Sequence, residues 1–426
     1  MDRIVITGGK PLYGSIVISG AKNAALPLMA ASILTKDTIV LANIPHLADV
    51  LTMSHLLINH GVKLSIDGVN TRQHPTGRVI LLNGESIKNF EAPYDIVRKM
   101  RASVLVLGPL LARYGYARVS LPGGCAIGAR PIDLHLSALE KMGAKIILES
   151  GYIEAKVDNR LKGAEIYFNF VSVGATENIL MASTLAEGKT VLYNAACEPE
   201  ITDLAKLLNA MGAKISGIGS STLEIEGVEQ LAGAYHVVIP DRIEVGTYAA
   251  AAVITGGELV LENIDYSICH NIMDKLANIG AKILVGDNNI TISCHGDRKA
   301  IDLTTGVFPG FPTDMQAQFM SILSLAKGTS VITENIFENR FMHVPELKRM
   351  GARISLAGNN ATIRGVDWLK GAEVMATDLR ASVSLILAGL AAKEETIINR
   401  VYHLDRGYER IEQKLSQCGA DIKRIY

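Results

Sequence analysis

A chain of 426 residues is too long for one ordinary hydrophobic core, so its length predicts at least two domains. Hydrophobic residues make up 48% of the chain and charged residues 20%, which indicates a folded globular protein and excludes a disordered one. The formal net charge of −1 excludes a general electrostatic attraction to nucleic acid or to a membrane surface. An anionic ligand would therefore need a local cluster of cations.

The cysteines and the apolar runs indicate a cytoplasmic protein. Five widely scattered cysteines with no CxxC pair favour neither a disulfide framework nor a zinc ribbon. The N-terminus, MDRIVITGGK, has no long apolar run, so a signal peptide is not expected. The longest apolar run, at 381–392, is about half the ~20 residues that a membrane span needs, and predicts a buried core helix.

A short phrase recurs six times, about 70 residues apart, and consists of a glycine, a small apolar residue, a charged residue and a second apolar residue, as in MGAKI. Each phrase follows an amphipathic stretch such as 201–215, whose apolar residues recur every three or four positions and predict a helix with one buried face. A left-handed glycine would end each helix and a strand would follow. The six glycines are Gly61, Gly143, Gly212, Gly280, Gly351 and Gly419.

A more apolar helix and a strand precede each of these phrases. The six helices are expected, in chain order, at 23–34, 102–114, 177–186, 246–255, 315–326 and 381–392. The strands that follow them are expected at 38–44, 117–123, 189–195, 258–264, 329–335 and 395–401. Each unit thus reads helix, strand, helix, strand, with three units in each half and a division near 227–239. A pair of similar α/β lobes is the expected architecture.

Three of the apolar helices begin with a cation. Lys22, Arg101 and Arg380 lie where the helix dipole disfavours positive charge, which suggests an anion that all three hold. The alternative is that each one pairs with a carboxylate on a neighbouring segment. Asp314, at the start of another of these helices, and Asp378, at the start of the same helix as Arg380, are ordinary capping residues on the simplest interpretation.

Arg340 and Arg406 each follow a strand and extend this set of cations. Either one alone would be interpreted as a solvated surface charge, but together with the helix-end cations they favour a site for phosphate and carboxylate groups. No GxxxxGK[ST] or GxGxxG motif follows a strand, and the histidines show no metal-binding spacing, so neither those nucleotide sites nor a metal is predicted.

The segment SLPGGCAIGARPID, residues 120–133, places Cys125 on a glycine-rich connection between a strand and a helix. The glycines favour a mobile lid, and Arg130 would shift the thiol toward the nucleophilic thiolate. A protonated thiol can instead donate its proton at neutral pH. From these residues alone, a small buried filler is an equally good interpretation of Cys125.

Long motifs along nearly the whole chain resemble the enolpyruvyl transferase family, and within it the UDP-N-acetylglucosamine 1-carboxyvinyltransferases. These motifs are SGAKNAALP, APYDIVRKMRAS, LPGGCAIGARPIDLH, SVGATEN, PDRIE, FPTDMQAQ, ENRFMHVPEL, MATDLRAS and HLDRGYERIE.

The resemblance implies an α/β fold of two similar inside-out, barrel-like domains, each built from three repeated strand–helix units, with a cleft between them. It implies an N-terminal lobe of 21–232, and a C-terminal lobe of 1–20 plus 233–426. The implied reaction moves the enolpyruvyl group of phosphoenolpyruvate onto the 3′-hydroxyl of UDP-N-acetylglucosamine and releases phosphate, by addition and then elimination. No cofactor or metal is implied, and the reaction begins peptidoglycan precursor synthesis in cell-wall formation.

The resemblance also assigns roles to residues. Cys125 would protonate phosphoenolpyruvate and be alkylated by the inhibitor fosfomycin, and Asp314 would accept the proton of the 3′-hydroxyl. The cations around phosphoenolpyruvate would be Lys22, Arg130 and Arg406. The surrounding charged shell would be Arg101, Arg340, Asp378 and Arg380. The residues lining the UDP-sugar would be Asn23, Arg130, Pro131, Ile132, Asp133, Leu134, Ser172, Val173, Gly174 and Ile336.

One position departs from the family pattern. Some relatives have a lysine where this chain has Phe170, two places before Ser172, so a diphosphate or uridine contact from that position does not carry over. Two alternatives to the leading hypothesis remain open from the sequence. One is the related enolpyruvyl transferase of the shikimate pathway, and the other is a UDP-sugar-binding regulator that has lost catalysis.

Overall fold

The computed structural model describes residues 2–67, 77–121 and 132–426. The described residues form two compact units, which we call the N-terminal unit (residues 20–67, 77–121 and 132–239) and the C-terminal unit (residues 2–19 and 240–426). Cys125, Arg130 and Pro131 lie outside the described residues. No helix in the described part of the chain is long and apolar enough to cross a membrane.

The described residues contain six four-stranded sheets with one common topology. In each sheet an edge strand pairs in parallel with its neighbour, which pairs antiparallel with a third strand, which in turn pairs antiparallel with the fourth. The first sheet of the N-terminal unit consists, in strand order, of β14 (Tyr235–Val237), β3 (Thr38–Ile44), β5 (Arg78–Asn83) and β4 (Lys63–Asp67). The second consists of β6 (Glu91–Ala92), β7 (Tyr116–Ser120), β9 (Tyr152–Lys156) and β8 (Lys145–Glu149). The third consists of β10 (Glu165–Tyr167), β11 (Lys189–Tyr193), β13 (Thr222–Glu226) and β12 (Lys214–Ser216).

The C-terminal unit repeats this arrangement three times. Its first sheet consists of β2 (Tyr13–Val17), β15 (Glu258–Glu262), β17 (Asn289–Ser293) and β16 (Lys282–Val285). The second consists of β18 (Leu303–Thr304), β19 (Thr329–Thr333), β21 (Asn360–Arg364) and β20 (Arg353–Ala357). The third consists of β22 (Glu373–Met375), β23 (Glu395–Asn399), β1 (Arg3–Thr7) and β24 (Asp421–Ile425).

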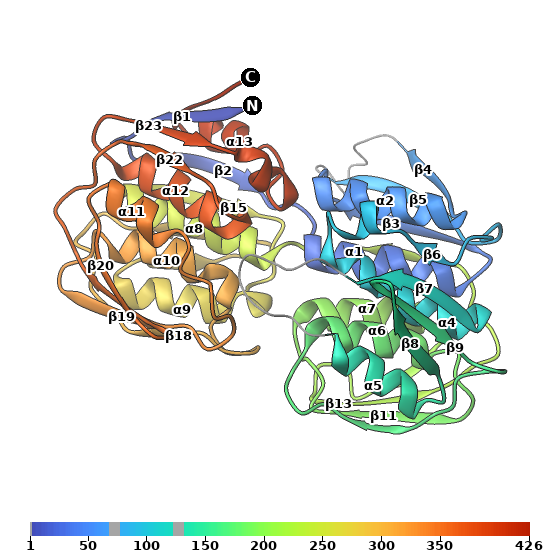
Figure 1. The fold of residues 1–426 in the computed structure, drawn as a ribbon. Helices are drawn as coiled ribbons and strands as arrows, with labels where there is room; N and C mark the ends of the chain where they lie inside the picture. The colour runs from blue at the N-terminus through green and yellow to red at the C-terminus, as the bar shows by residue number, and fades with distance from the viewer. Residues whose placement is uncertain (1, 68–76, 122–131) are drawn as a thin grey trace. The chain divides into compact units, whose positions relative to one another are not determined.

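Three inner helices form the centre of the C-terminal unit, while its sheets lie outside them (Figure 1). These helices are α8 (Arg242–Thr255), α10 (Gln316–Leu323) and α12 (Leu379–Ala391), and each packs against the other two. The inner helices of the N-terminal unit are α1 (Lys22–Ala30), α4 (Leu107–Tyr114) and α6 (Val173–Ser183). Almost every residue of these six helices is buried, because they pack against other helices and sheets rather than facing water. This inside-out α/β arrangement confirms the predicted fold class.

The six predicted outer helices are present. They are α2 (Ala48–His60), α5 (Asp133–Lys141), α7 (Pro199–Ala210), α9 (His270–Ile279), α11 (Val344–Arg349) and α13 (Ile411–Gln417). A further short helix, α3 (Tyr94–Val97), was not predicted. Short 3₁₀ helices lie at η1 (Ala31–Leu34), η2 (Arg101–Val106), η3 (Tyr266–Ile268), η4 (Thr313–Met315) and η5 (Val401–Arg406).

The six repeated glycines all have positive φ, between 94° and 117°, and lie one or two residues after the end of an outer helix. This backbone conformation is strained for residues with a Cβ atom, so the prediction that these glycines end the outer helices is confirmed. The predicted count of two strands per unit is wrong, because each sheet has four. The additional strands are an edge strand and a hairpin partner, and the sequence pattern did not separate them.

The chain ends complete sheets of the C-terminal unit. Strand β1 pairs antiparallel with β23 and β24, and β2 pairs in parallel with β15. In the N-terminal unit, β14 pairs in parallel with β3, although almost 200 residues separate Tyr235 from Val40. The same sheet topology is thus assembled from segments that are distant in the sequence.

Candidate active site

Asp314 of the C-terminal unit lies between two buried guanidinium groups. It belongs to η4, just before α10, and its two carboxylate oxygens accept hydrogen bonds from Arg340 Nη2 at 2.5 Å and Arg380 Nη2 at 2.8 Å. Both arginines are buried, whereas the Asp314 side chain keeps 26% of its surface exposed. Two charge-assisted hydrogen bonds favour the ionised carboxylate, and its exposed edge can still contact a ligand.

Arg380 is held from its other side as well. Its Nη1 donates to the Tyr408 hydroxyl at 3.0 Å, and that hydroxyl lies 2.8 Å from Thr247 Oγ1. Burial lowers the pKa of Arg380, but the charge of Asp314 outweighs it and leaves the pKa above its ordinary value. Arg380 is therefore a fixed cation in an oriented network.

The two acidic residues at inner-helix starts differ in role. Asp378 is the N-cap of α12, and its Oδ1 accepts from the backbone N–H groups of Arg380 and Ala381, which confirms the capping interpretation. The capping interpretation is wrong for Asp314, whose described carboxylate contacts are the two arginines. For Arg340, the interpretation as a solvated surface charge is wrong too, because the side chain is buried against Asp314.

Glu334 is a buried carboxylate that the sequence did not reveal. Its Oε1 accepts from the backbone N–H of Ile336 at 2.8 Å and from Thr305 Oγ1 at 2.8 Å. Its Oε2 accepts from Thr313 Oγ1, also at 2.8 Å. Glu334 thus ties the segment that contains Ile336 to η4, beside Asp314. In the sequence, the one feature that could have pointed to Glu334 is its place directly after the apolar residues of β19 (Thr329–Thr333).

In the N-terminal unit, Lys22 and Asn23 begin α1. Lys22 Nζ lies 3.3 Å from Asp49 Oδ2, and both side chains are largely buried. The alternative that each helix-start cation pairs with a carboxylate is therefore confirmed for Lys22, as it is for Arg380 with Asp314. A carboxylate partner does not prevent a lysine from also binding an anion, because an ammonium group has three donors.

The starts of α5 and α6 converge in the N-terminal unit. Residues 132–134 lead into α5, with Ile132 and Leu134 buried and Asp133 exposed. Ser172 is the N-cap of α6, and its Oγ accepts from the Ala175 N–H at 3.3 Å. The ring of His135, on α5, lies beside Gly174, on α6. The structure therefore brings together the two segments that were predicted to line a UDP-sugar.

The remaining predicted residues are also assigned to units. Arg101 begins η2 in the N-terminal unit, while Arg406 ends η5 in the C-terminal unit and is half-buried. Phe170, two residues before the N-cap of α6, is 53% exposed.

Of the cysteines within the described residues, Cys269, Cys294 and Cys418 are buried, and burial raises the pKa of Cys269 to about 12. The burial of these three thiols is typical of structural, unreactive cysteines.

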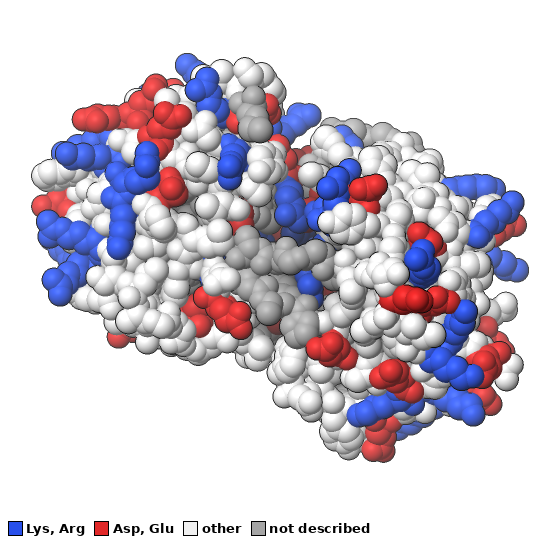
Figure 2. Space-filling model, in the orientation of Figure 1, with Lys and Arg blue, Asp and Glu red and all other residues white. Residues whose placement is uncertain are grey.

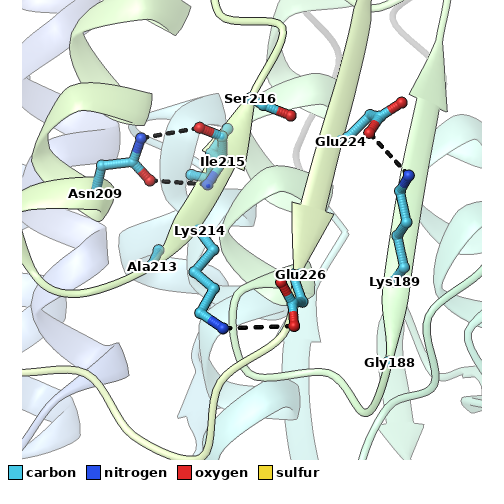
Figure 3. Close-up of a pocket in the computed structure, with 9 residues that line it drawn as sticks. All are labelled: Gly188, Lys189, Asn209, Ala213, Lys214, Ile215, Ser216, Glu224 and Glu226. Atoms are coloured by element: carbon cyan, nitrogen blue, oxygen red, sulfur yellow. Dashed lines mark hydrogen bonds and ion pairs between the residues drawn. The ribbon is translucent and has the colours of Figure 1, made fainter.

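Surface features away from these residues carry little chemistry. On the visible face of each unit, lysine and arginine intermingle with aspartate and glutamate (Figure 2). A cavity of about 600 Å³ lies on β11, β12 and β13, but Lys189 and Lys214 on its wall are paired with Glu224 and Glu226 (Figure 3). None of its described lining residues is a predicted site residue.

Within residues 2–67, 77–121 and 132–426, no three His, Cys, Asp or Glu side chains are grouped so that they could hold a metal ion.

The fold and the charged site define an enolpyruvyl transferase. The model of the EPSP synthase (3-phosphoshikimate 1-carboxyvinyltransferase) family matches residues 6–415. The chain belongs to this enolpyruvyl transferase family, and within it to the group of the UDP-N-acetylglucosamine 1-carboxyvinyltransferases, as its curated relatives indicate.

Two of these relatives match over their whole length. The chain is 60% identical to the UDP-N-acetylglucosamine 1-carboxyvinyltransferase of Paramagnetospirillum magneticum, with 100% of this chain and 99% of that protein covered. It is 61% identical to the protein of the same name from Granulibacter bethesdensis, with 100% of both chains covered.

Solved structures support the fold. The enolpyruvyl transferase NikO from Streptomyces tendae is 24% identical, with a TM-score of 0.89 over 99% of this chain and 98% of that one. EPSP synthase from Acinetobacter baumannii is 19% identical, with a TM-score of 0.75 over 100% of both chains.

Proposed function

We propose that the protein transfers the enolpyruvyl group of phosphoenolpyruvate to the 3′-hydroxyl of UDP-N-acetylglucosamine and releases phosphate. The observation that carries this proposal is the 58–61% identity, over the full length, to relatives named for that reaction. The alternative acceptor, 3-phosphoshikimate, appears in the name of the family model, but the EPSP synthase structures share only 19–20% identity with this chain.

The proposal divides an addition–elimination reaction among the assigned residues, of which Asp314, Lys22 and Arg406 lie in the described part of the chain. Asp314 would accept the proton of the 3′-hydroxyl while the new C–O bond forms at C2 of phosphoenolpyruvate. Cys125 would give a proton to the methylene carbon in the same addition. In the elimination, that carbon would lose a proton and the C–O bond to phosphate would break. Fixed cations would stabilise the departing phosphate, and Lys22, Arg130 and Arg406 are assigned this role.

Arg340 and Arg380 would orient Asp314, because each of them donates a hydrogen bond to its carboxylate. Arg101 and Asp378 would complete the charged shell. Asn23, residues 130–134, residues 172–174 and Ile336 would contact the UDP-sugar. The product would enter peptidoglycan precursor synthesis, and so serve cell-wall biogenesis, cell shape and cell division in the cytoplasm. Fosfomycin would alkylate Cys125.

The test is phosphate release by the purified protein with phosphoenolpyruvate and either acceptor. We expect release with UDP-N-acetylglucosamine and none with 3-phosphoshikimate. Release that depends on 3-phosphoshikimate would favour the alternative transferase. Tight binding of UDP-N-acetylglucosamine without any release would favour the non-catalytic regulator.

A further inference from the structure

The segment that carries Arg406 has a strained backbone. This segment, residues 400–410, follows β23 and contains η5, and we call it the η5 connection. Arg400, directly before η5, has a φ of 59°, and Arg410 has a φ of 46°. Left-handed conformations are unfavourable for residues other than glycine, and they persist only where the surrounding structure enforces them. A short 3₁₀ helix adds little stability of its own, because its hydrogen-bond geometry is poor. The position of Arg406 therefore depends on what holds this segment from outside.

The part of the η5 connection after Arg406 is anchored on the inner helices. A Cβ atom built at Gly407 would lie only 2.6 Å from Leu379 Cδ2, at the start of α12, so the backbone packs closely there. Tyr408 is 2% exposed, and its hydroxyl accepts from Arg380 Nη1 at 3.0 Å. These contacts fix the two residues that follow Arg406.

The part before Arg406 is held by the last strand of the chain. Arg424, on β24, donates from Nη2 to Asp405 Oδ1 at 2.6 Å, and Asp405 directly precedes Arg406. The Arg424 side chain keeps 15% of its surface exposed and that of Asp405 keeps 42%. Strand β24 pairs with β1, with Arg424 opposite Ile4, so the guanidinium group belongs to a paired strand rather than to a loop.

Stability alone does not explain an arginine at position 424. Its Nε is buried and has no hydrogen-bond partner within the described residues, and a buried donor without a partner destabilises a fold. Burial lowers the pKa of Arg424, but the hydrogen bond and charge of Asp405 and the charges of Glu412 and Asp2 outweigh burial and raise it. What the arginine supplies is a charge-assisted hydrogen bond of fixed direction to Asp405.

We propose that Arg424 is a positioning residue for the phosphate-binding cation Arg406, and that it acts through Asp405. The ion pair fixes the end of η5, and so keeps the Arg406 guanidinium in place for the phosphate of phosphoenolpyruvate. This inference rests on the proposed function, which assigns Arg406 to that phosphate. It gives the C-terminal strand a part in substrate binding.

The first test is Arg424→Met, which removes the charge and keeps an unbranched apolar stem. We expect the KM for phosphoenolpyruvate to rise about tenfold, an effect typical of losing one hydrogen bond to a charged group, because a displaced Arg406 binds phosphate less well. The Kd for UDP-N-acetylglucosamine, measured by calorimetry, should stay within about twofold. An equal loss of affinity for both substrates would mean a general structural effect, and would overturn the inference.

Lys423→Met is the matched control. Lys423 precedes Arg424 on β24 and its side chain is exposed, so the KM for phosphoenolpyruvate should not change. A similar rise in this variant would mean that any change in β24 disturbs the site, and would contradict a specific role for Arg424.

Arg424→Lys separates charge from shape. One ammonium donor can replace the single described bond from Nη2 to Asp405, so the KM for phosphoenolpyruvate should lie within about threefold of wild type. If the lysine variant were as impaired as Arg424→Met, the charged bond to Asp405 would not be what positions Arg406.

Asp405→Asn tests the other half of the pair, and it keeps the inference testable if Arg424→Met does not fold. Asp405 is partly exposed, so we expect a folded protein whose KM for phosphoenolpyruvate rises as in Arg424→Met. The double variant should be no worse than either single variant, because both changes remove the same interaction. Effects that multiply in the double variant would show that the two residues act independently, against the inference.

The outcomes separate the two proposals. A wild-type KM for phosphoenolpyruvate in both Arg424→Met and Asp405→Asn, in a protein that releases phosphate, would overturn this inference alone. A wild-type protein that releases no phosphate with UDP-N-acetylglucosamine and phosphoenolpyruvate would overturn the proposed function, and this inference with it.

Discussion

Arg380 donates to Asp314 and to Tyr408 through two different guanidinium nitrogens, at 2.8 and 3.0 Å. A lysine could not make both bonds in fixed directions, because its ammonium group is a single point of charge on a flexible chain. The Tyr408 hydroxyl in turn contacts Thr247, on α8. The orientation of the Asp314 carboxylate is therefore fixed from the three inner helices α8, α10 and α12, which together form the centre of one unit.

Asp314→Asn should abolish most of the activity. An amide cannot accept the proton of the 3′-hydroxyl, and we expect kcat to fall by at least about a hundredfold, as losses of general-base catalysis reach 10²–10⁴-fold. The variant also removes the carboxylate that pairs with two buried guanidinium groups, so the free energy of unfolding should fall by about 3 kcal/mol. Steady-state kinetics and urea unfolding measure the two effects.

Asp297→Asn is the control for Asp314→Asn. Asp297 pairs with Lys327 on the surface of the same unit, with 68% of its side chain exposed, so neither kcat nor stability should change measurably. If Asp314→Asn kept kcat within twofold of wild type, Asp314 would not be the proton acceptor.

Glu334→Gln should change substrate binding more than chemistry. The carboxylate accepts hydrogen bonds at both oxygens, and glutamine replaces one of these oxygens by a donor. We expect a stability loss of about 1–2 kcal/mol, with a several-fold higher KM for UDP-N-acetylglucosamine because the segment with Ile336 is no longer fixed. Glu338→Gln, an exposed change in the same connection, should have neither effect. An unchanged KM in Glu334→Gln would show that this connection does not position the acceptor.

Buried neutral histidines should make the protein sensitive to mild acid. Burial lowers the pKa of His343 to about 4, with Asp378 opposing and Arg340 reinforcing the shift, and the pKa of His135 is also about 4. In the unfolded chain both would titrate near their ordinary value of about 6.5. Between these values the unfolded state binds more protons, so stability is complete above about pH 6.5 and falls as the pH drops toward 4.

His343→Gln is the variant that tests this pH dependence. Each buried histidine should contribute on the order of 3 kcal/mol of this acid-dependent loss. Urea unfolding at pH 7.0, 5.5 and 4.5 should therefore show a shallower decline in the variant than in wild type. The same decline in both proteins would mean that His343 does not titrate with the expected low pKa.

The repeat was predictable because it depends on local chemistry. A glycine with positive φ must end each outer helix wherever that helix occurs, so Gly61 and its five equivalents were visible in the sequence. The placement of the strands at the chain ends was not, because their partners are distant; β1 pairs with β23 and β24 from the opposite end of the chain. Pairing across such distances leaves no local pattern.

The same reasoning applies to the candidate site. The cations at the helix starts were recognised from their conflict with the helix dipole. The pairing of Arg340 and Arg380 with Asp314 was not recognised, because these arginines are 26 and 66 residues away from Asp314 in the chain. Glu334 was missed for a related reason, since it is defined by hydrogen bonds that only the folded chain makes.

Cys125→Ser should separate binding from turnover. A serine hydroxyl is a far weaker acid than a thiol with a pKa near 8.5, so it cannot protonate the methylene carbon of phosphoenolpyruvate efficiently. We expect at least a hundredfold loss of kcat, wild-type Kd for UDP-N-acetylglucosamine, and no covalent labelling by fosfomycin in mass spectrometry. Cys197→Ser is the control, because Cys197 is a partly exposed free thiol whose pKa is raised by burial and by Glu198, and its removal should leave both labelling and kcat unchanged. Wild-type turnover in Cys125→Ser would exclude the thiol as the proton donor, and labelling that disappears only in Cys197→Ser would assign the fosfomycin site to the other cysteine.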